Sequence, residues 1–163
     1  MELPEWLPEM ASISPWEHDT YERLYDEFHN AFIVGTVQLA GKTVGYDSTI
    51  VDEKENGFWH ITTKTSEDGD RLPDPRRCEK LVWLKPMIEN SDKSEVLVWE
   101  EDAGKGSFKI YVWLENYDYV AVIKKNRNGK LYLVTAYAVE YPNVRRKLKS
   151  QYNKSKKPNK LTP

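Results

Sequence analysis

The spacing of hydrophobic residues predicts a helix near the start of the chain. Apolar side chains recur there at intervals of three and four residues, at Tyr21, Leu24, Tyr25, Phe28 and Phe32. This spacing is typical of an amphipathic helix that packs on a core. Ser14, Pro15 and Glu17 suit the cap and first turn of a helix, so we expect the helix to begin there.

After this helix the pattern changes to the two-residue period of strands. Polar and apolar positions alternate over residues 43–50, and a second run covers 57–63 after a turn-like segment, so the two runs predict a β-hairpin. An Asp-Pro pair at 74–75 predicts a second helix near 74–90, kinked or ended at Pro86. The residues expected on its buried face are Cys78, Leu81 and Val82.

The second half of the chain is rich in β-forming residues. Four runs predict strands, at 95–99, 108–114, 119–123 and 131–139. Asn128 and Gly129 tolerate the positive φ of a tight turn and should join the last two runs as a hairpin. A short basic helix is expected from Tyr141. Helices at the edges of an antiparallel sheet make the predicted fold class α+β.

The length of 163 residues favours one domain. We expect an extended N-terminal arm over residues 1–13, a single α+β domain over 14–152 and a basic flexible tail over 153–163. No apolar run approaches the roughly 20 residues of a membrane helix, and the acidic start of the chain is unlike a signal peptide. Cys78 is the single cysteine, which favours a reducing, cytoplasmic setting without a membrane partner.

Charge is distributed unevenly along the chain. The formal net charge is −2, but the segment after Glu140 has eight basic and no acidic residues, which leaves −10 for residues 1–140. Such a segment attracts polyanions, most often nucleic-acid phosphates, and its alternative is a solvated lysine-rich tail. The expected RNA-binding residues are Arg76, Arg145, Arg146, Lys147 and Lys149.

Several common cofactor and metal motifs are missing from the sequence. The GKG string at 104–106 lacks the third glycine and the following helix of a nucleotide-binding loop. His18, His29 and His60 share no close spacing, and none of them belongs to an HExxH motif. The sequence therefore predicts neither a cofactor nor a metal site.

One predicted strand carries a proton-transfer group and a cation. Strand alternation over 58–64 puts His60 and Lys64 on one face, with Trp59 and Ile61 in the core. The imidazole of His60 titrates near neutrality and can act as acid or base, and Lys64 can hold a phosphate. In the alternative interpretation, His60 only packs beside Trp59 or bonds a backbone carbonyl.

Arginines and hydroxyl groups complete the candidate set. Arg71, Arg76 and Arg77 flank the start of the second helix, and a guanidinium group can bind two phosphate oxygens. Their alternative role is an ion pair with a neighbouring carboxylate. Thr135 and Tyr137 share one face of the last strand. They can bind a phosphate, position a proton or stack on a base, or they are ordinary members of a sheet.

The order of these features resembles a known nuclease family. An N-terminal helix, H-x-x-x-K at His60 to Lys64, an arginine-bearing helix and T-x-Y at Thr135 to Tyr137 resemble the barnase, EndoU, colicin and RelE-type (BECR) ribonuclease superfamily. The similarity is to its phage- and mobile-element-associated branches and covers roughly residues 17–141. It implies metal-independent RNA cleavage by a histidine, a lysine or arginine, and a hydroxyl group on one sheet face.

We therefore expect a metal-independent endoribonuclease or ribonuclease-like toxin in which the substrate's own 2′-hydroxyl is the nucleophile. His60 would take the 2′-proton. Lys64 and Arg77 would offset phosphate charge, and Thr135 or Tyr137 would orient the phosphate. The expected partner is RNA, with a neutralising protein as a second partner. The alternatives are a non-catalytic module that binds nucleic acid or protein, and a protein that itself neutralises a basic toxin.

Overall fold

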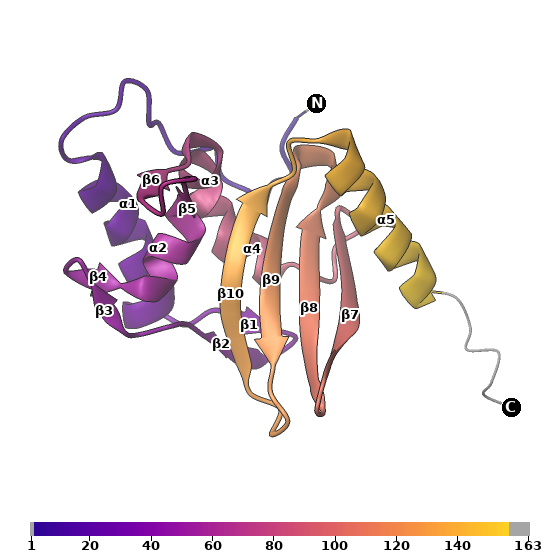
Figure 1. Cartoon of the computed structure of the whole chain (residues 1–163). Helices are drawn as coiled ribbons and strands as arrows, with labels where there is room; N and C mark the ends of the chain where they lie inside the picture. The colour runs from indigo at the N-terminus through magenta and orange to yellow at the C-terminus, as the bar shows by residue number, and fades with distance from the viewer. Residues whose placement is uncertain (1, 157–163) are drawn as a thin grey trace, which may run out of the picture.

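A six-stranded sheet forms the centre of the α+β fold (Figure 1). The structure is a computed structural model and describes residues 2–156. The strand order is β1-β2-β10-β9-β8-β7, in which β2 and β10 run parallel and the other neighbours are antiparallel. The strands are β1 (Gln38–Leu39), β2 (Lys42–Gly45), β7 (Val96–Gly104), β8 (Ser107–Leu114), β9 (Tyr119–Lys125) and β10 (Leu131–Ala138).

Helices cover the two faces of this sheet unequally. The N-terminal helices pack on one face and form the larger core with it, in which Val112 and Ala121 are fully buried. These helices are α1 (Thr20–Phe28), its π-helical continuation η1 (His29–Val34), α2 (Asn56–Thr62), α3 (Pro75–Lys80), the 3₁₀ turn η2 (Leu81–Trp83) and α4 (Leu84–Glu89). On the opposite face, α5 (Pro142–Lys156) lies along β7 at one side of the sheet.

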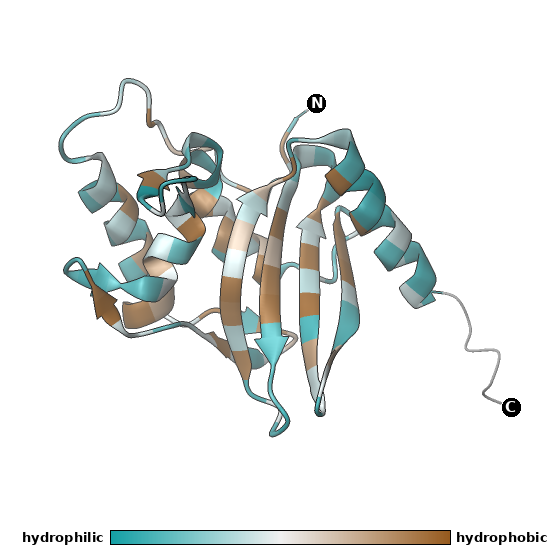
Figure 2. Cartoon of the chain, viewed as in Figure 1, coloured by the Kyte–Doolittle hydropathy of each residue, from teal (hydrophilic) through white to brown (hydrophobic). Residues whose placement is uncertain are grey.

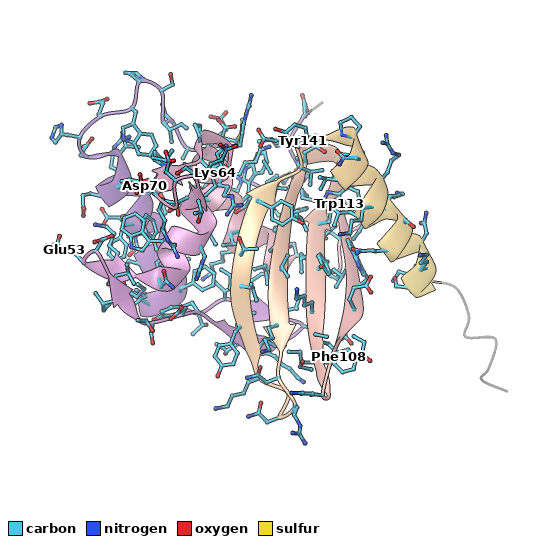
Figure 3. The ribbon with its side chains drawn as sticks, in the orientation of Figure 1. Glu53, Lys64, Asp70, Phe108, Trp113 and Tyr141 are labelled. Atoms are coloured by element: carbon cyan, nitrogen blue, oxygen red, sulfur yellow. The ribbon has the colours of Figure 1, made fainter. Side chains whose placement is uncertain are left out.

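A second, smaller core lies beneath α5. Its buried members include Trp113 from β8, which is labelled in Figure 3. The others are Trp99 from β7, Val120 from β9, Val139 just after β10 and Leu148 from α5. Since both faces of β9 are covered, every residue from Tyr119 to Ile123 is buried, and Figure 2 shows the apolar character of this strand. The sheet therefore separates two cores of different size.

A bulge in β10 decides which of its side chains reach each face. The pairing of β10 with β9 shifts between Leu133 and Thr135. Leu133 and Ala136 consequently both contribute to the larger core, although they are three residues apart. Thr135 and Tyr137 lie on the other face together, as predicted, and the bulge separates them from Leu133.

Two small hairpins flank α2 in the chain. The first consists of β3 (Ile50–Val51) and β4 (Lys54–Glu55), and the second of β5 (Thr63–Thr65) and β6 (Arg71–Pro73). Gly57 at the start of α2 lies so close to the preceding segment that an added Cβ would be 3.1 Å from Tyr46 Cβ. This close approach places α2 next to β10. The short β2 pairs only with Leu131 and Tyr132, so the rest of β10 has no neighbouring strand on that side.

Most predicted elements are present, and the four predicted C-terminal strands and the basic helix are confirmed. The second helix begins at Asp74, whose carboxylate accepts hydrogen bonds from the backbone N–H groups of Arg76 and Arg77. Pro86 neither ends nor breaks this region, because it lies in the first turn of α4, where its missing N–H leaves no helical bond unmade.

Three predictions about elements are wrong. The first helix begins at Thr20 rather than Ser14. The predicted hairpin of 43–50 with 57–63 is absent, because residues 46–49 lie outside any strand and residues 57–62 form part of α2. The strand alternation that set the faces of His60 and its neighbours therefore does not apply. Residues 153–156 belong to α5 rather than to a flexible tail, and the remainder of that predicted tail lies outside the described residues. Among residues 2–156, none of the helices combines the length and hydropathy that crossing a membrane requires.

Candidate functional site

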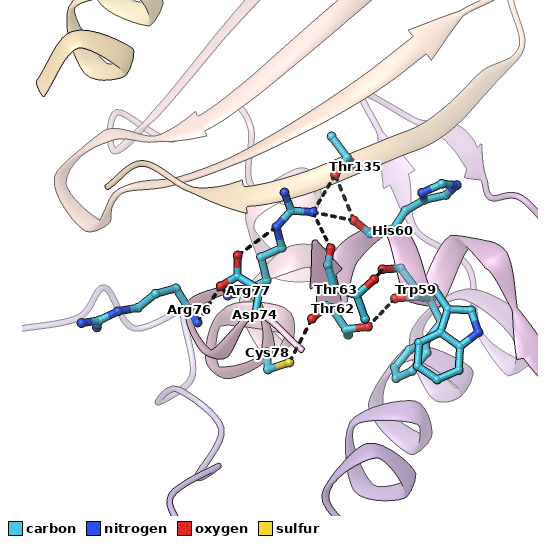
Figure 4. A network of polar contacts seen from close by, with 10 residues as sticks. Trp59, His60, Thr62, Thr63, Asp74, Arg76, Arg77, Cys78 and Thr135 are labelled. Atoms are coloured by element: carbon cyan, nitrogen blue, oxygen red, sulfur yellow. Dashed lines mark hydrogen bonds and ion pairs between the residues drawn. The ribbon is translucent and has the colours of Figure 1, made fainter. Parts of the chain in front are cut away.

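Arg77 lies where α2, α3 and β10 meet and organises the candidate site (Figure 4). Its Nη1 atom donates hydrogen bonds to the backbone carbonyl oxygens of His60 (2.9 Å) and Thr63 (3.1 Å). Nη1 also lies 3.4 Å from Thr135 Oγ1, and this hydroxyl donates to the same His60 carbonyl at 3.0 Å. Carbonyl groups at the end of α2, which lack partners within the helix, are thus bonded by side chains from α3 and β10.

The opposite edge of the Arg77 guanidinium faces Asp74. Arg77 Nε lies 3.4 Å from Asp74 Oδ2, and the two side chains are 20% and 8% exposed, so water screens this ion pair weakly. The guanidinium carbon also lies 6.0 Å from the centre of the Tyr137 ring. Nη2 makes no hydrogen bond within residues 2–156 and is therefore the donor left for a ligand.

The His60 imidazole points away from the Arg77 guanidinium (Figure 4) and belongs to a second polar cluster. Asn56 Nδ2 lies 3.1 Å from His60 Nε2 and 3.0 Å from Asp47 Oδ2. An amide nitrogen can only donate, so His60 Nε2 is the acceptor and the ring proton is on Nδ1. The imidazole is 37% exposed, which leaves it accessible to a ligand.

Burial and two nearby guanidinium groups lower the pKa of His60 below its ordinary value of 6.5. Burial has the largest effect, and Arg71 and Arg77 act in the same direction, while the Asp47 carboxylate opposes them. The hydrogen bond from Asn56 lowers the pKa of Asp47 in turn, so Asp47 is ionised at neutral pH. His60 is therefore neutral at pH 7, which is the form that accepts a proton.

The prediction that His60 and Lys64 lie on one face of a strand is wrong, because the two residues belong to different elements. His60 lies in the last turn of α2, whereas Lys64 lies on β5, is exposed and makes no ion pair within residues 2–156. In the β5–β6 hairpin, Lys64 pairs with Leu72 and Thr65 pairs with Arg71, so Lys64 and Arg71 point to opposite faces. Arg71, rather than Lys64, is the hairpin cation close enough to lower the pKa of His60.

The face of the sheet beside Arg77 carries a row of aromatic rings. Thr135 and Tyr111 both pair with Val122 on β9, so their side chains share this face with Tyr137. The Tyr111 ring stacks on Trp99, with ring centres 5.0 Å apart and planes 5° from parallel. Tyr137 and Tyr111 are half-buried, so each side chain is partly accessible on this face of the sheet.

Both phenol groups in this row remain protonated at neutral pH. Burial raises the pKa of Tyr111, and the negative charge of Glu101 raises it further. Burial also raises the pKa of Tyr137, where the Tyr111 phenol acts in the same direction and the Arg77 cation acts against it. Each hydroxyl can therefore donate a hydrogen bond to an anion on this face.

Two of the predicted RNA-binding residues on α5 are engaged with carboxylates of the domain. Arg145 Nη1 lies 2.7 Å from Asp118 Oδ1, and Lys149 Nζ lies 2.7 Å from Glu115 Oε2. These pairs hold α5 against the turn between β8 and β9. The neighbouring predicted residues Arg146 and Lys147 are exposed and make no ion pair within the described part of the chain.

Arg76 points away from the site formed by its neighbour Arg77 (Figure 4). Its side chain is 62% exposed and lies 3.4 Å from Glu79, which is the ion-pair role considered for these arginines. Successive residues of a helix point about 100° apart, so only one of the two arginines can face β10. The structure therefore brings Arg77, Thr135 and Tyr137 together with the backbone of His60.

Asp47 and Asn56 are site residues that the strand interpretation does not reveal. They hold the His60 ring, and Asn56 reaches it because the two residues are four positions apart in α2. The one signal in the sequence is this four-residue spacing, which has meaning only in a helix. Asp47 belongs to a separate loop, and only the folded chain brings it to Asn56.

Neither the donor set nor the comparisons with known proteins assign a role to the site. Within residues 2–156, no three His, Cys, Asp or Glu side chains are grouped so that they could hold a metal ion. Comparison of the chain with protein-family models, with curated proteins and with solved structures finds no match.

Proposed function

We propose that the protein is a metal-independent endoribonuclease of the BECR type that acts in the cytoplasm. The observation that carries this proposal is a neutral, partly exposed His60 imidazole, whose pKa is lowered first by burial and then by the guanidinium groups of Arg71 and Arg77. Transfer of a phosphoryl group to a neighbouring hydroxyl needs a base and cations, and here the base lies within the electrostatic influence of two guanidinium groups. The Thr135 hydroxyl oxygen lies 3.4 Å from Nη1 of the Arg77 guanidinium.

In this mechanism RNA supplies the nucleophile. His60 Nε2 accepts the proton of the 2′-hydroxyl, which takes the position that the Asn56 amide holds in the structure. The 2′-oxygen bonds to phosphorus, the bond from phosphorus to the 5′-oxygen breaks, and the leaving oxygen takes a proton from water. Arg77 Nη2 and Arg71 offset the charge on the non-bridging oxygens. His60 returns its proton to water, and the product is a 2′,3′-cyclic phosphate.

The aromatic row supports single-stranded RNA as the substrate. Tyr137 lies next to Arg77, and Tyr111 is backed by Trp99, so an unpaired base next to the cleaved bond can stack on either phenol ring. A base in a duplex does not present its face in this way. The neutralising protein partner expected from the resemblance stays a prediction.

Cleavage of a single-stranded RNA by the full chain tests the proposal. We expect His60→Gln to lower the cleavage rate by about two to four orders of magnitude. The matched control is His18→Gln, which changes an exposed histidine just before α1 and should cleave at the wild-type rate. The reaction should continue in excess EDTA and leave a 2′,3′-cyclic phosphate. A 2′-deoxy group at the cleaved position should stop it.

Three results would contradict the proposed activity. They are normal cleavage by His60→Gln, cleavage that EDTA abolishes and magnesium restores, and cleavage of the 2′-deoxy substrate, because water would then be the nucleophile. Tight binding of RNA with no cleavage under any condition would favour the non-catalytic binding module instead.

A further inference from the structure

A basic hollow lies between the tips of two hairpins, at the end of the sheet remote from Arg77. The β7–β8 and β9–β10 turns line a cavity of about 620 Å³. Its lining residues are Ala103, Gly104, Lys105, Ser107, Lys124, Asn126, Arg127 and Asn128. Three of these side chains are cationic and none is acidic, so the hollow concentrates positive charge in a chain whose net charge is negative.

The two hairpin tips are held next to each other by a specific contact. An added Cβ on Gly106 would be 3.3 Å from Arg127 Cγ, so the stem of Arg127 lies directly on the backbone of the neighbouring turn. Gly106 has φ of +80°, a conformation that residues with side chains rarely adopt. The glycine therefore allows both the turn and the close approach of Arg127.

The cations of this hollow are uncompensated within the described residues. Lys105, Lys124 and Arg127 are exposed, and none of them makes an ion pair with residues 2–156. By contrast, the neighbouring Lys125 lies 2.7 Å from Glu100. Like charges gathered at one place repel each other, and an anion that binds between them relieves this repulsion.

The hollow continues the sheet face that carries the candidate site. Lys124 is two residues beyond Val122 on β9, so it lies on the same face as Thr135 and Tyr137. It pairs with Tyr132 on one side and Lys109 on the other. Four residues of strand separate Lys124 from the partner of Tyr137, a distance of about 13 Å, which a few nucleotides of extended RNA can span.

We propose that this hollow binds the backbone phosphates of single-stranded RNA on one side of the bond that is cleaved. The inference rests on the proposed ribonuclease function and names the path of the substrate, from Arg77 down the sheet face to the hairpin tips. The hollow takes the role predicted from the sequence for Arg145 and Lys149 of α5, because these two residues are paired with Asp118 and Glu115.

Binding of a 12-nucleotide 2′-O-methyl RNA, which cannot be cleaved, tests the proposal as a function of salt. We expect the triple variant Lys105→Gln/Lys124→Gln/Arg127→Gln to weaken binding at low salt at least tenfold. The slope of log affinity against log salt should fall by about two, since each lost phosphate contact on a single strand contributes about 0.7. The single variant Lys105→Gln should lower the slope by about 0.7 and repeats the test with less change to the turns.

The matched control removes three positive charges elsewhere. Arg23→Gln/Lys42→Gln/Lys93→Gln changes exposed residues of α1, β2 and the loop after α4, and we expect binding to stay within twofold of the wild type. Equal weakening in the control and hollow variants would overturn the proposal, because only net charge would then matter. An unchanged salt slope in the hollow variants would overturn it as well.

Cleavage of a dinucleotide separates this inference from the proposed function. A dinucleotide occupies the site around His60 and is too short to reach the hollow, so the hollow variant should cleave it at the wild-type rate while cleaving a 12-nucleotide RNA more slowly at low concentration. If no RNA is cleaved by the wild type but the 12-nucleotide ligand still depends on the hollow, the ribonuclease proposal fails and the phosphate-binding hollow stands.

Discussion

His60 is the residue whose environment most directly sets the proposed chemistry. Its ring is held by Asn56 and Asp47 on one side and exposed to the field of two guanidinium groups on the other. Burial and these cations favour the neutral ring, and only Asp47 favours the charged one. Because its pKa is lowered, the His60 imidazole is still neutral at a mildly acidic pH and can still act as a base there.

Charge substitutions around His60 should move its pKa in opposite directions. Arg71→Gln removes a cation and should raise the pKa of His60, whereas Asp47→Asn removes an anion and should lower it further. The imidazole proton resonances, followed by NMR against pH and assigned with His60→Gln, measure both shifts. Cleavage should increase as His60 loses its proton, with a midpoint below 6.5 that rises in Arg71→Gln.

The same pKa shift makes the folded state less stable in acid. The pKa of His60 is about 6.5 in the unfolded chain and lower in the folded chain. At pH values between these two pKa values, the unfolded state binds more protons than the folded state. The free energy of unfolding therefore decreases as the pH falls through this window. Arg71→Gln should weaken this pH dependence. A pH dependence that is unchanged in His60→Gln would show that other groups cause it.

Phe58 and Trp59 exchange the roles expected for them in a strand. Phe58 is fully buried among the rings of α1, whereas Trp59 is half-buried and donates its indole N–H to the Val51 carbonyl at 2.7 Å. Phe58→Ala should therefore lower the free energy of unfolding by about 3–5 kcal/mol, and Trp59→Ala by clearly less. Urea unfolding measures both, and a larger loss for Trp59→Ala would contradict this order.

At the scale of elements, the sequence predicts the long strands well and the short helix α2 badly. In β8, β9 and β10, β-branched and aromatic residues are frequent over seven or eight positions, long enough to identify a strand. The segment 57–63 is shorter and contains Trp59, Ile61 and two threonines, which favour strands locally. Packing of Phe58 and Ile61 on the core overrides this preference, and their three-residue spacing fits a helix.

The part of the candidate site that lies on a long strand or a capped helix was predictable, and the part that depends on α2 was not. Thr135 and Tyr137 lie on a long strand and share a face as predicted, and Arg77 follows a capping Asp74 that the sequence identifies. The relation of His60 to Lys64 was not predictable, because it depended on the type of the element between them. Asp47 and Arg71 reach His60 from separate loops and strands, and such contacts leave no periodic signal in the sequence.

Arg77 joins three elements, so its replacement should affect folding as well as activity. Lysine has a single nitrogen and cannot bond the carbonyl groups of His60 and Thr63 while facing Asp74. Arg77→Lys should lower the free energy of unfolding by about 1–3 kcal/mol, since the Thr63 carbonyl is left without this donor and the His60 carbonyl keeps only the Thr135 hydroxyl. It should also speed hydrogen exchange at the end of α2.

The neighbouring arginine provides the control for this prediction. Arg76 is exposed on the same helix, and Arg76→Lys keeps its charge beside Glu79. Its free energy of unfolding should stay within about 0.5 kcal/mol of the wild type. If the two variants are equally stable, Arg77 does not hold α2 to β10 in the way that its hydrogen bonds indicate.

At the scale of the whole molecule, the uneven charge along the chain is partly neutralised by the fold. The basic α5 returns to the acidic body, and Glu115 and Asp118 pair with Lys149 and Arg145. The cations of the hollow, which make no ion pair within residues 2–156, come instead from β9 and from the turns between strands. A count of charges along the sequence identifies the basic segment but not which of its charges remain available.

The position of β9 between two cores has a consequence for how the native protein opens. The larger core needs no contact from α5, whereas the smaller one is closed by Leu148 and its neighbours. We expect the amides of α5 to exchange with solvent together, through an opening that costs less free energy than global unfolding, while those of β9 exchange only when the whole chain unfolds. Leu148→Ala should make the α5 opening more frequent and leave β9 the slowest strand to exchange. During each such opening Trp99 and Trp113 are wetted, so collisional quenching of tryptophan emission would report how often the smaller core is exposed in a chain that is otherwise native.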